Sequence, residues 1–473
     1  MPFHSMAYGF FFACVVAVHF LLPHRLRGLF LVAASYAFYM AWDPRYALLL
    51  LTSTGMGYSA GLLLARSAGP RRRRAILLAG LVVNLGMLLA FKYANLARDA
   101  LAPLSSALWP SLEPRAVDIA LPVGLSFYTF QTLGYLFDVY RRRIEPERNM
   151  ARFALFVSFF PQLLAGPIGR ARELLPQIRE PRGFDALRAL EGIQLIAWGL
   201  FQKVVVADRL ALYVDWVYAA PRLHSVSARW LAMYFFAVQL YCDFAGYTDI
   251  ARGSARVLGF DLAQNFRLPF FSTTTAEFWQ RWHMTLMNWF RDYLYLPLVL
   301  QYRSQLSVYA CAMLVMLVSG VWHGAGTTFL VWGLSQGILV CLSRFTLAFR
   351  DGIYARLRVP TPLVRAIRIM ITFHLFAITL VFFRARSLAD AAYILNQTFD
   401  PGQQVHFSGV PMVQCLAAIL VLLLVQLLQA RRPLQPLLNQ APRALRWAVY
   451  YAVVFAIVLF GVDSGVQFIY LQF

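Results

Sequence analysis

The sequence predicts an all-α, polytopic membrane protein, and three observations carry that prediction. Of 473 residues, 60% are hydrophobic and only 14% are charged, whereas soluble domains carry about a quarter charged residues. Apolar runs of roughly 17 to 22 residues recur along the chain, each able to cross a hydrocarbon core about 30 Å thick as a helix. The net charge of +21 gathers in alternate loops, as in cytoplasmic segments. We therefore expect a single membrane-embedded domain over residues 1–473.

The N-terminal spans are expected within residues 5–92. The first apolar run, residues 7–22, lacks the basic flank and the small-residue cleavage site of a signal peptide, so we interpret it as a span. Arginines follow the first, third and fifth spans, at 25–27, 66–74 and 141–148. Because basic loops stay in the cytoplasm, this alternation predicts an N-terminus on the opposite side of the membrane.

Residues 152–168 interrupt the alternation because arginines flank the segment on both sides. A re-entrant segment, broken by Pro161, Gly166 and Pro167, accounts for this better than a span does. An amphipathic stretch is expected up to about residue 303. The remaining predicted spans bring the total to about 11–13 and are 189–206, 229–246, 304–320, 326–344, 363–383, 411–429 and 446–463.

Several functional classes fit this sequence poorly. A basic protein can bind nucleic acid, but here the arginines follow the topology of the loops, where anionic lipid attracts them. The five cysteines lie singly in apolar runs, which indicates neither a disulfide framework nor a metal site. No internal repeat is visible, although many transporters are built from inverted repeats.

Two histidines are the candidate catalytic residues. His323 ends an apolar run, and an ionisable group at membrane depth is by default a functional hypothesis. Gly320, Gly324 and Gly326 surround it and would let a substrate approach the ring. His283 is expected to share one helical face with Trp279 and Met287, although an interfacial helix also collects such residues without any catalytic role.

A buried, neutral imidazole suits proton transfer near pH 7. It could remove the proton from an acceptor hydroxyl that attacks a thioester. No nucleophile elbow of the G-x-S-x-G type occurs. Two histidines without a third ligand do not favour a catalytic metal.

Five segments together resemble one family. They are "LPVGLSFYTFQTLGYLFDVYR", "FFPQLLAGPIGR", "QLYCDFAGYTDIARGSARVLGF", "FWQRWHMTLMNWFRDYLYLPL" and "VWHGAGTTFLVWGLSQG". They resemble the membrane-bound O-acyltransferase family, in particular its bacterial alginate and exopolysaccharide O-acetyltransferase branch. The resemblance covers a core of about residues 92–345, with C-terminal spans at 363–463.

The resemblance implies a protein of the bacterial inner membrane, so that the N-terminus is expected in the periplasm. It also implies a helical bundle with a central funnel or tunnel. It implies that His323 matches the invariant family histidine and His283 the second one. It also implies acetyl-CoA as a cytoplasmic donor substrate with no bound cofactor, a polysaccharide acceptor, and a periplasmic or membrane-anchored acetyltransferase partner. The aromatic-rich stretch is then expected to line the route to His323, with channel-lining candidates Trp279, Arg281, Trp282, Asn288, Arg291, Asp292 and Trp322.

The acceptor and the donor remain open at the level of the sequence. After "DYLYLPL" the chain reads "VLQYRSQ", which departs from the alginate branch, so that alginate and cellulose are equally plausible acceptors. The branch that moves D-alanine onto teichoic acids resembles the same histidine segments. The sequence is also compatible with a long-chain acyltransferase and with a transporter that moves acyl carriers or glycans without chemistry.

Other polar residues have simpler structural interpretations. Asp243 is expected to cap or pair within the bundle. Arg170 and Lys203 could contact donor phosphates, although snorkelling to the interface is the commoner role. His374 is expected to be a hydrogen-bonded core histidine.

Overall fold

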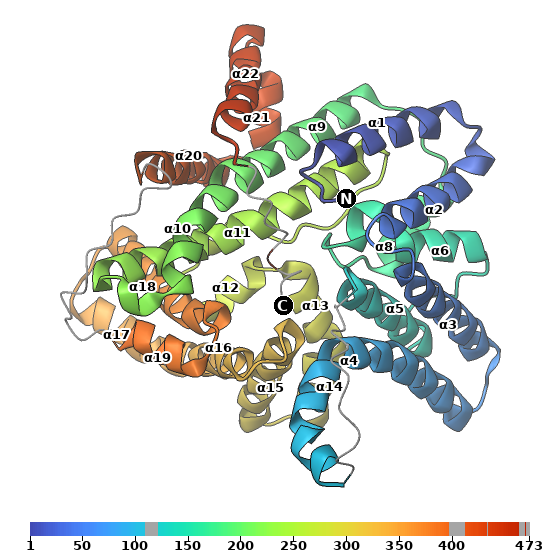
Figure 1. Ribbon diagram of the computed structural model, residues 1–473, viewed down its shortest axis with the longest axis horizontal. Helices are drawn as coiled ribbons and strands as arrows, with labels where there is room; N and C mark the ends of the chain where they lie inside the picture. The colour runs from blue at the N-terminus through green and yellow to red at the C-terminus, as the bar shows by residue number, and fades with distance from the viewer. Residues whose placement is uncertain (109–121, 397–411, 433, 463–468, 470–473) are drawn as a thin grey trace. The chain divides into compact units, whose positions relative to one another are not determined.

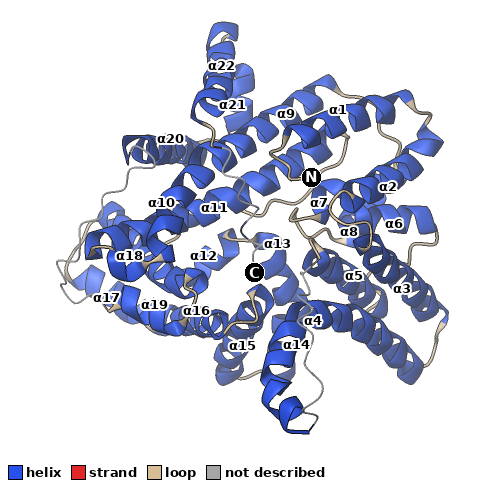
Figure 2. Cartoon of the chain, in the orientation of Figure 1, coloured by secondary structure: helices blue, strands red, loops and turns tan. Residues whose placement is uncertain are grey.

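A computed structural model of the chain describes residues 1–108, 122–396, 412–432, 434–462 and 469, with the backbone alone over 99–108. All regular elements in these ranges are helices, as Figure 2 shows, and this confirms the all-α prediction. The chain divides into two compact units. Unit 1 comprises Met1–Gly192 and Ala251–Ala263, and unit 2 comprises Ile193–Ile250 and Gln264–Phe473.

Unit 1 is built from helices that follow one another along the chain (Figure 1). They are α1 (Met6–Leu21), α2 (His24–Met40), α3 (Tyr46–Arg66), α4 (Pro70–Leu108), α5 (Leu125–Tyr140), α6 (Met150–Ser158), α7 (Phe160–Leu163) and α8 (Ala171–Arg179). The start of α9 (Ala186–Leu200) and the end of α11 (Val226–Val257) also belong to it.

The segment predicted to be re-entrant forms two short helices. Helix α6 ends at Ser158 and α7 begins at Phe160, so neither is long enough to cross a membrane. The break lies at Phe159, and Pro161 stands in the first turn of α7, where proline is tolerated. The helix is therefore interrupted directly before Pro161, as expected of a proline that cannot continue a helix. The backbone N–H of Phe160 donates to Ser35 Oγ at 3.1 Å, so a neighbouring helix satisfies a group that the break exposes.

Unit 2 contains the remaining elements. They are η1 (Phe201–Ala207), α10 (Asp208–Ala219), η2 (Pro221–Leu223), η3 (Pro269–Phe271), α12 (Thr275–Arg281), α13 (Met284–Phe290), η4 (Arg291–Tyr295), α14 (Leu296–Tyr302), α15 (Gln305–His323), α16 (Thr327–Phe345), α17 (Leu347–Arg356), α18 (Thr361–Arg384), α19 (Leu388–Leu395), α20 (Met412–Arg431), α21 (Leu434–Gln440) and α22 (Arg443–Phe460).

Seven helices in the described residues are long and apolar enough to cross a membrane. They are α3, α4 over Pro70–Arg98, α15, α16, α18, α20 and α22. The predicted spans 189–206 and 229–246 also fall on helices, but these are α9 running into the π-helix η1 and the more polar α11. The start of the predicted span 411–429 and the end of 446–463 lie outside the described residues. A total of about twelve spans stays a prediction.

Lys203 lies in the π-helix η1 and does not snorkel. Its Nζ is 2.8 Å from Asp208 Oδ1 and 2.6 Å from Asp243 Oδ1, and all three side chains are buried. The expectation that Asp243 pairs within the bundle is confirmed, whereas that of a snorkelling lysine is wrong. A buried cation needs such partners because desolvation would otherwise disfavour its charge. His374 shares a hydrogen bond with the Tyr234 hydroxyl at 2.5 Å, as predicted, but it is half-buried and does not belong to the core.

Helices α15 and α16 pack against each other along their length and carry the candidate site. Ser304 caps α15 and forms a capping box with Ser307, which fixes where this helix begins. A Cβ on Gly320 would lie 2.5 Å from the Phe329 carbonyl oxygen of α16. Only glycine therefore permits this close approach of two helices.

Candidate active site

His323 is the last residue of α15, as the sequence predicts. Its side chain is buried, with 5% of the residue exposed. The imidazole is surrounded by aromatic rings: its centroid lies 4.7 Å from that of Trp322, 4.9 Å from that of Trp332 and 5.2 Å from that of Phe383. The arrangement encloses the ring in a water-poor, aromatic environment.

The glycines beside His323 have a packing role that the sequence analysis did not foresee. Gly320 faces the backbone of α16, and a Cβ on Gly324 would lie 2.2 Å from the ring of Phe329. The space next to these glycines is filled by protein. The expectation that they open the imidazole to a substrate is therefore wrong for Gly320 and Gly324.

His283 stands at a break between α12 and α13. Its φ of 43° places it in the left-handed region, which is uncommon for residues other than glycine. The loop residue Asn265 stabilises the break, because its backbone oxygen accepts from Met284 N at 2.9 Å and its side-chain oxygen accepts from Thr285 Oγ1 at 2.7 Å. The expectation that His283 shares a continuous helical face with Trp279 and Met287 is therefore wrong.

The break turns the imidazole of His283 into the protein interior. The residue is 1% exposed, and its ring centroid lies 4.7 Å from that of Phe244 and 5.9 Å from that of Trp322. His283 lies outside the seven candidate spans, and burial lowers its pKa to about 3. Trp322 contacts both histidine rings, so the structure brings the two predicted catalytic residues together around one indole.

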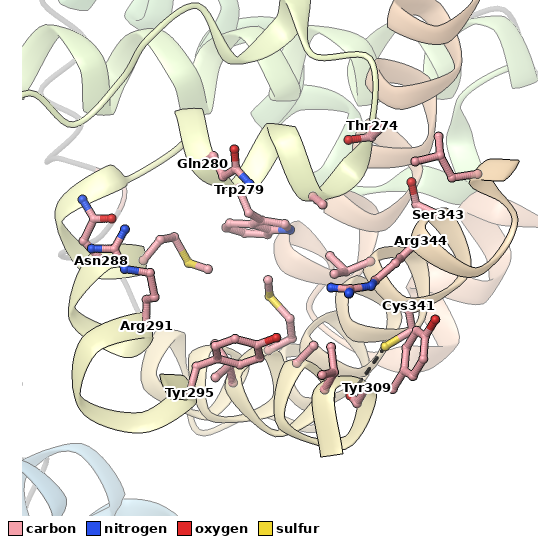
Figure 3. A pocket seen from close by; sticks show the side chains of 18 of the residues that line it. Thr274, Trp279, Gln280, Asn288, Arg291, Tyr295, Tyr309, Cys341, Ser343 and Arg344 are labelled. Atoms are coloured by element: carbon pink, nitrogen blue, oxygen red, sulfur yellow. Dashed lines mark hydrogen bonds between the residues drawn. The ribbon is translucent and has the colours of Figure 1, made fainter. Parts of the chain in front are cut away.

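A cavity of about 830 Å³ lies beside this aromatic cluster, within the volume range of ligand pockets. Figure 3 shows Trp279 of α12 on one side, Tyr295 of η4 on the other, and the guanidinium of Arg344 extending from the end of α16 into the cavity. Apolar side chains of α15, among them Val315 and Met316, contribute to its wall. The cavity therefore combines an apolar interior with cationic groups.

The two arginines of the cavity differ in their partners. Arg291 Nε is 2.9 Å from Asp292 Oδ1, and 54% of the Arg291 side chain is exposed. In the described part of the chain, no carboxylate pairs with Arg344. Arg344 is therefore available to an anionic ligand without first losing a carboxylate partner.

Two tryptophans, Trp279 and Trp332, lie between the cavity and His323. Trp279 lines the cavity, and its ring centroid is 5.9 Å from that of Trp332, which contacts His323. Trp279 Nε1 donates to Gln336 Oε1 at 3.3 Å, and Gln336 Nε2 donates to Thr379 Oγ1 at 2.5 Å. Neither His323 nor His283 lines the cavity.

The predicted channel-lining residues divide into two groups. Trp279, Asn288 and Arg291 line the cavity, whereas Arg281, Trp282, Asp292 and Trp322 do not. Arg281 pairs with Glu277 at 2.5 Å. Trp282 packs on Phe278 and Phe376, with ring centroids 5.4 Å and 5.2 Å away.

Sequence reasoning missed four residues of this region. Arg344 has no role in the sequence analysis, and Trp332 and Gln336 stand in the quoted segment "VWHGAGTTFLVWGLSQG" without an assigned role. Their spacing from His323, nine and thirteen residues along the chain, was the available signal for a facing helix. Asn265 offered no signal, because only the folded loop shows that it supports His283.

Comparisons with known proteins confirm the family that the sequence resembles. A sequence model described as MBOAT, membrane-bound O-acyltransferase family, matches residues 141–383. The probable alginate O-acetylase AlgI of Pseudomonas aeruginosa is 36% identical over 455 residues, 94% of this chain and 84% of that protein.

Two relatives with other acceptors are more distant. The peptidoglycan O-acetyltransferase of Helicobacter pylori is 32% identical over 82% of this chain and 76% of that protein. The teichoic acid D-alanyltransferase of Bacillus subtilis is 29% identical over 47% of this chain and 59% of that protein.

Proposed function

The chain belongs to the membrane-bound O-acyltransferase family, and from this premise we propose that it moves an acetyl group from cytoplasmic acetyl-CoA to an exopolysaccharide such as alginate or cellulose. Membership makes it a multi-pass membrane O-acyltransferase. The acetyl donor, the acceptor polymer, the catalytic base and the direction of transfer belong to the proposal.

His323 is the general base of this proposal. The observation that carries it is the buried imidazole at the end of α15, separated by Trp332 and Trp279 from a cavity with a cationic group. In its neutral form an imidazole has a ring nitrogen that can accept a proton. The acceptor hydroxyl attacks the thioester carbonyl carbon while His323 removes the hydroxyl proton, a contribution of typically 10²–10⁴-fold. His283 supports this centre through Trp322.

The cavity is the proposed donor site. Its wall includes residues in the first two-thirds of α15, up to Met316, and residues at the end of α16. Met316 precedes His323 by seven residues, about 10 Å along a helix. Coenzyme A carries phosphates that Arg344 and Arg291 can attract, while the apolar interior suits the pantetheine arm and the acetyl group.

The basic residues after α16 support a cytoplasmic position for the donor site. Arg350, Arg356 and Arg358 follow Arg344 within a short segment, as expected of a cytoplasmic loop. His323 is the last residue of α15, at the end of this helix that is farther from the proposed donor site. The acceptor, or a periplasmic or membrane-anchored acetyltransferase partner, would then approach His323 from the periplasmic side of the inner membrane, where the N-terminus also lies.

Radiolabelled acetyl-CoA tests the proposal with purified protein in detergent or nanodiscs. We expect acetyl transfer to an added oligosaccharide, or hydrolysis of the thioester, that is lost in His323→Ala. His24→Ala is the matched control, because His24 is exposed at the start of α2. Turnover in His323→Ala equal to that of the wild type would refute the catalytic assignment.

The relatedness to teichoic acid D-alanyltransferase supplies a second candidate donor, a D-alanyl thioester. The same assay with D-alanyl carrier protein and with palmitoyl-CoA separates the donors. A strong preference for either over acetyl-CoA would replace the proposed donor and leave the role of His323 intact.

A further inference from the structure

Helices α15 and α16 are antiparallel neighbours whose register is set by close backbone approaches. A Cβ on Gly320 would lie 2.5 Å from the Phe329 carbonyl oxygen, and one on Gly333 would lie 2.6 Å from the Met316 carbonyl oxygen. Position 320 thus faces 329, and position 316 faces 333. The residue numbers of the facing positions increase along α15 and decrease along α16, as in an antiparallel pair. Gly320 and Gly333 therefore lie on the faces along which the two helices touch.

Ser319 and Trp332 project to the same side of this contact. Each precedes one of the facing glycines, Gly320 or Gly333, by one residue, which is a rotation of about 100° around the helix. Because the helices run in opposite directions, the two rotations bring both side chains to one side of the pair. His323 follows Ser319 by four residues and shares its face, and the His323 and Trp332 rings are 4.9 Å apart.

The Ser319 hydroxyl and the Trp332 indole N–H are both buried, and neither has a hydrogen-bond partner within the described residues. Trp332 is 3% exposed and Ser319 is 0% exposed, while the indole Nε1 and the hydroxyl Oγ are unpartnered. Ser35, Thr54 and Ser158 show the usual arrangement, in which a buried helical hydroxyl donates to the carbonyl four residues earlier. Ser319 departs from it.

An unpartnered buried group does not by itself indicate a site, because Trp42 in unit 1 also has an indole N–H without a partner in the described chain. The distinguishing feature is the coincidence of two such groups on one side of a helix pair, together with His323. Buried polar groups are nearly always paired. Two neighbouring exceptions beside a candidate base therefore point to a ligand that supplies the missing acceptor.

We propose that the Trp332 indole N–H and the Ser319 hydroxyl donate hydrogen bonds to the acyl carbonyl oxygen during transfer and stabilise the oxyanion that forms there. This inference rests on the proposed function of His323. It assigns two further catalytic residues, which would contact the reacting acyl group directly. An indole N–H can only donate, and a hydroxyl can do so, as a developing negative charge requires.

The reaction step balances without another reactant. The acceptor oxygen forms a bond to the carbonyl carbon, the carbonyl electron pair moves onto its oxygen, and His323 takes the hydroxyl proton. When the tetrahedral intermediate collapses, the carbonyl re-forms, the carbon–sulfur bond breaks, and the leaving thiolate takes the proton from His323. The products are an ester and a free thiol, and Trp332 and Ser319 keep their own protons throughout.

Trp332→Phe and Ser319→Ala test the inference in the full-length protein, with acetyl-CoA as donor. Each variant removes one hydrogen-bond donor, and Ser319→Ala barely changes the packing volume. We expect kcat to fall about 10²-fold in each, as for one lost oxyanion donor, with the KM for acetyl-CoA nearly unchanged. Trp42→Phe is the matched control and should retain the wild-type kcat. Size-exclusion profiles and circular dichroism report whether each variant is folded.

The outcomes separate this inference from the proposed function. If His323→Ala is inactive but folded Ser319→Ala and Trp332→Phe retain the wild-type kcat, the two donors do not act and the role of His323 stands. A rise in KM at constant kcat would also overturn the inference, because it indicates ground-state binding. If His323→Ala turns over like the wild type, the proposed function itself fails.

Discussion

Unit 2 contains two groups of buried polar side chains that use their hydrogen-bonding capacity in opposite ways. In the first, Lys203 contacts both Asp208 and Asp243, and the second oxygen of Asp243 accepts from the backbone N–H of Ile469 at 2.8 Å. In the second, Ser319 and Trp332 lie beside His323 without partners in the described chain. In the first group the lysine and the carboxylates are paired within the protein. In the second group the Ser319 hydroxyl and the Trp332 indole N–H have no acceptor in the described chain.

This difference distinguishes buried polar residues that stabilise the fold from those that act in catalysis. A buried ion cluster persists only if its charges are paired, and removal of one partner leaves an uncompensated charge. A catalytic centre instead needs hydrogen-bond donors that are unpaired in the free enzyme and stabilise the charge that develops in the transition state. We therefore expect substitutions in the Lys203 cluster to change stability, and substitutions around His323 to change turnover.

The largest expected effect is on turnover. His323→Gln keeps a polar side chain of similar size but removes the base, so acetyl transfer should fall about 10²–10⁴-fold while the apparent unfolding temperature changes little. Initial rates with radiolabelled acetyl-CoA and a thermal-shift assay on the same preparation measure both quantities. A large loss of stability with turnover per folded molecule preserved would erase the contrast between the two groups.

The second effect should show the opposite pattern. Lys203→Met leaves Asp208 and Asp243 buried without their cation, which costs about 3–5 kcal/mol of stability. The triple variant with Asp208→Asn and Asp243→Asn should recover much of this loss. We expect a low folded yield and a lower unfolding temperature in Lys203→Met, with turnover per folded molecule near that of the wild type. If Lys203→Met has normal stability but no turnover, Lys203 acts in catalysis and this prediction is wrong.

The sequence predicted the helical class and His323 because both follow from local features, namely apolar runs and one ionisable residue at the end of such a run. It failed at His283, where the 278–298 stretch has the composition of one amphipathic helix. Asn265 instead accepts hydrogen bonds from Met284 and Thr285 and breaks that helix. A contact between residues about twenty positions apart leaves no trace in periodicity.

The same limit applies to the surroundings of His323. Trp332 and Ser319 join it only through the register of α15 and α16, which the close approach of Gly320 and Gly333 sets. The sequence supplied these glycines but not the facing positions. The role of Lys203 was likewise hidden, because snorkelling and pairing predict the same residue in the same apolar run.

A third prediction concerns pH and His283. The pKa of this buried ring is about 3, against about 6.5 in the unfolded chain. Between these values the unfolded state binds more protons, so stability is full above pH 6.5 and falls as the pH drops towards 3, by up to about 1.4 kcal/mol per pH unit. His283→Asn should flatten this dependence, because asparagine tolerates a positive φ and does not titrate. Unfolding temperatures between pH 7.5 and 5 measure it, and parallel curves for both proteins would contradict it.

The smallest expected effect concerns the two arginines of the cavity, one with a carboxylate partner and one without. Arg344 has no carboxylate partner in the described chain, whereas Arg291 pairs with Asp292. Exposed charges contribute about 0.2–1 kcal/mol, so Arg344→Gln should raise the KM for acetyl-CoA by roughly 1.4- to 5-fold. Arg291→Gln should change it less. High salt should weaken the wild type more than Arg344→Gln, since screening removes what the substitution has already removed. An equal KM in both variants at low salt would mean that pairing does not decide which cation meets the donor.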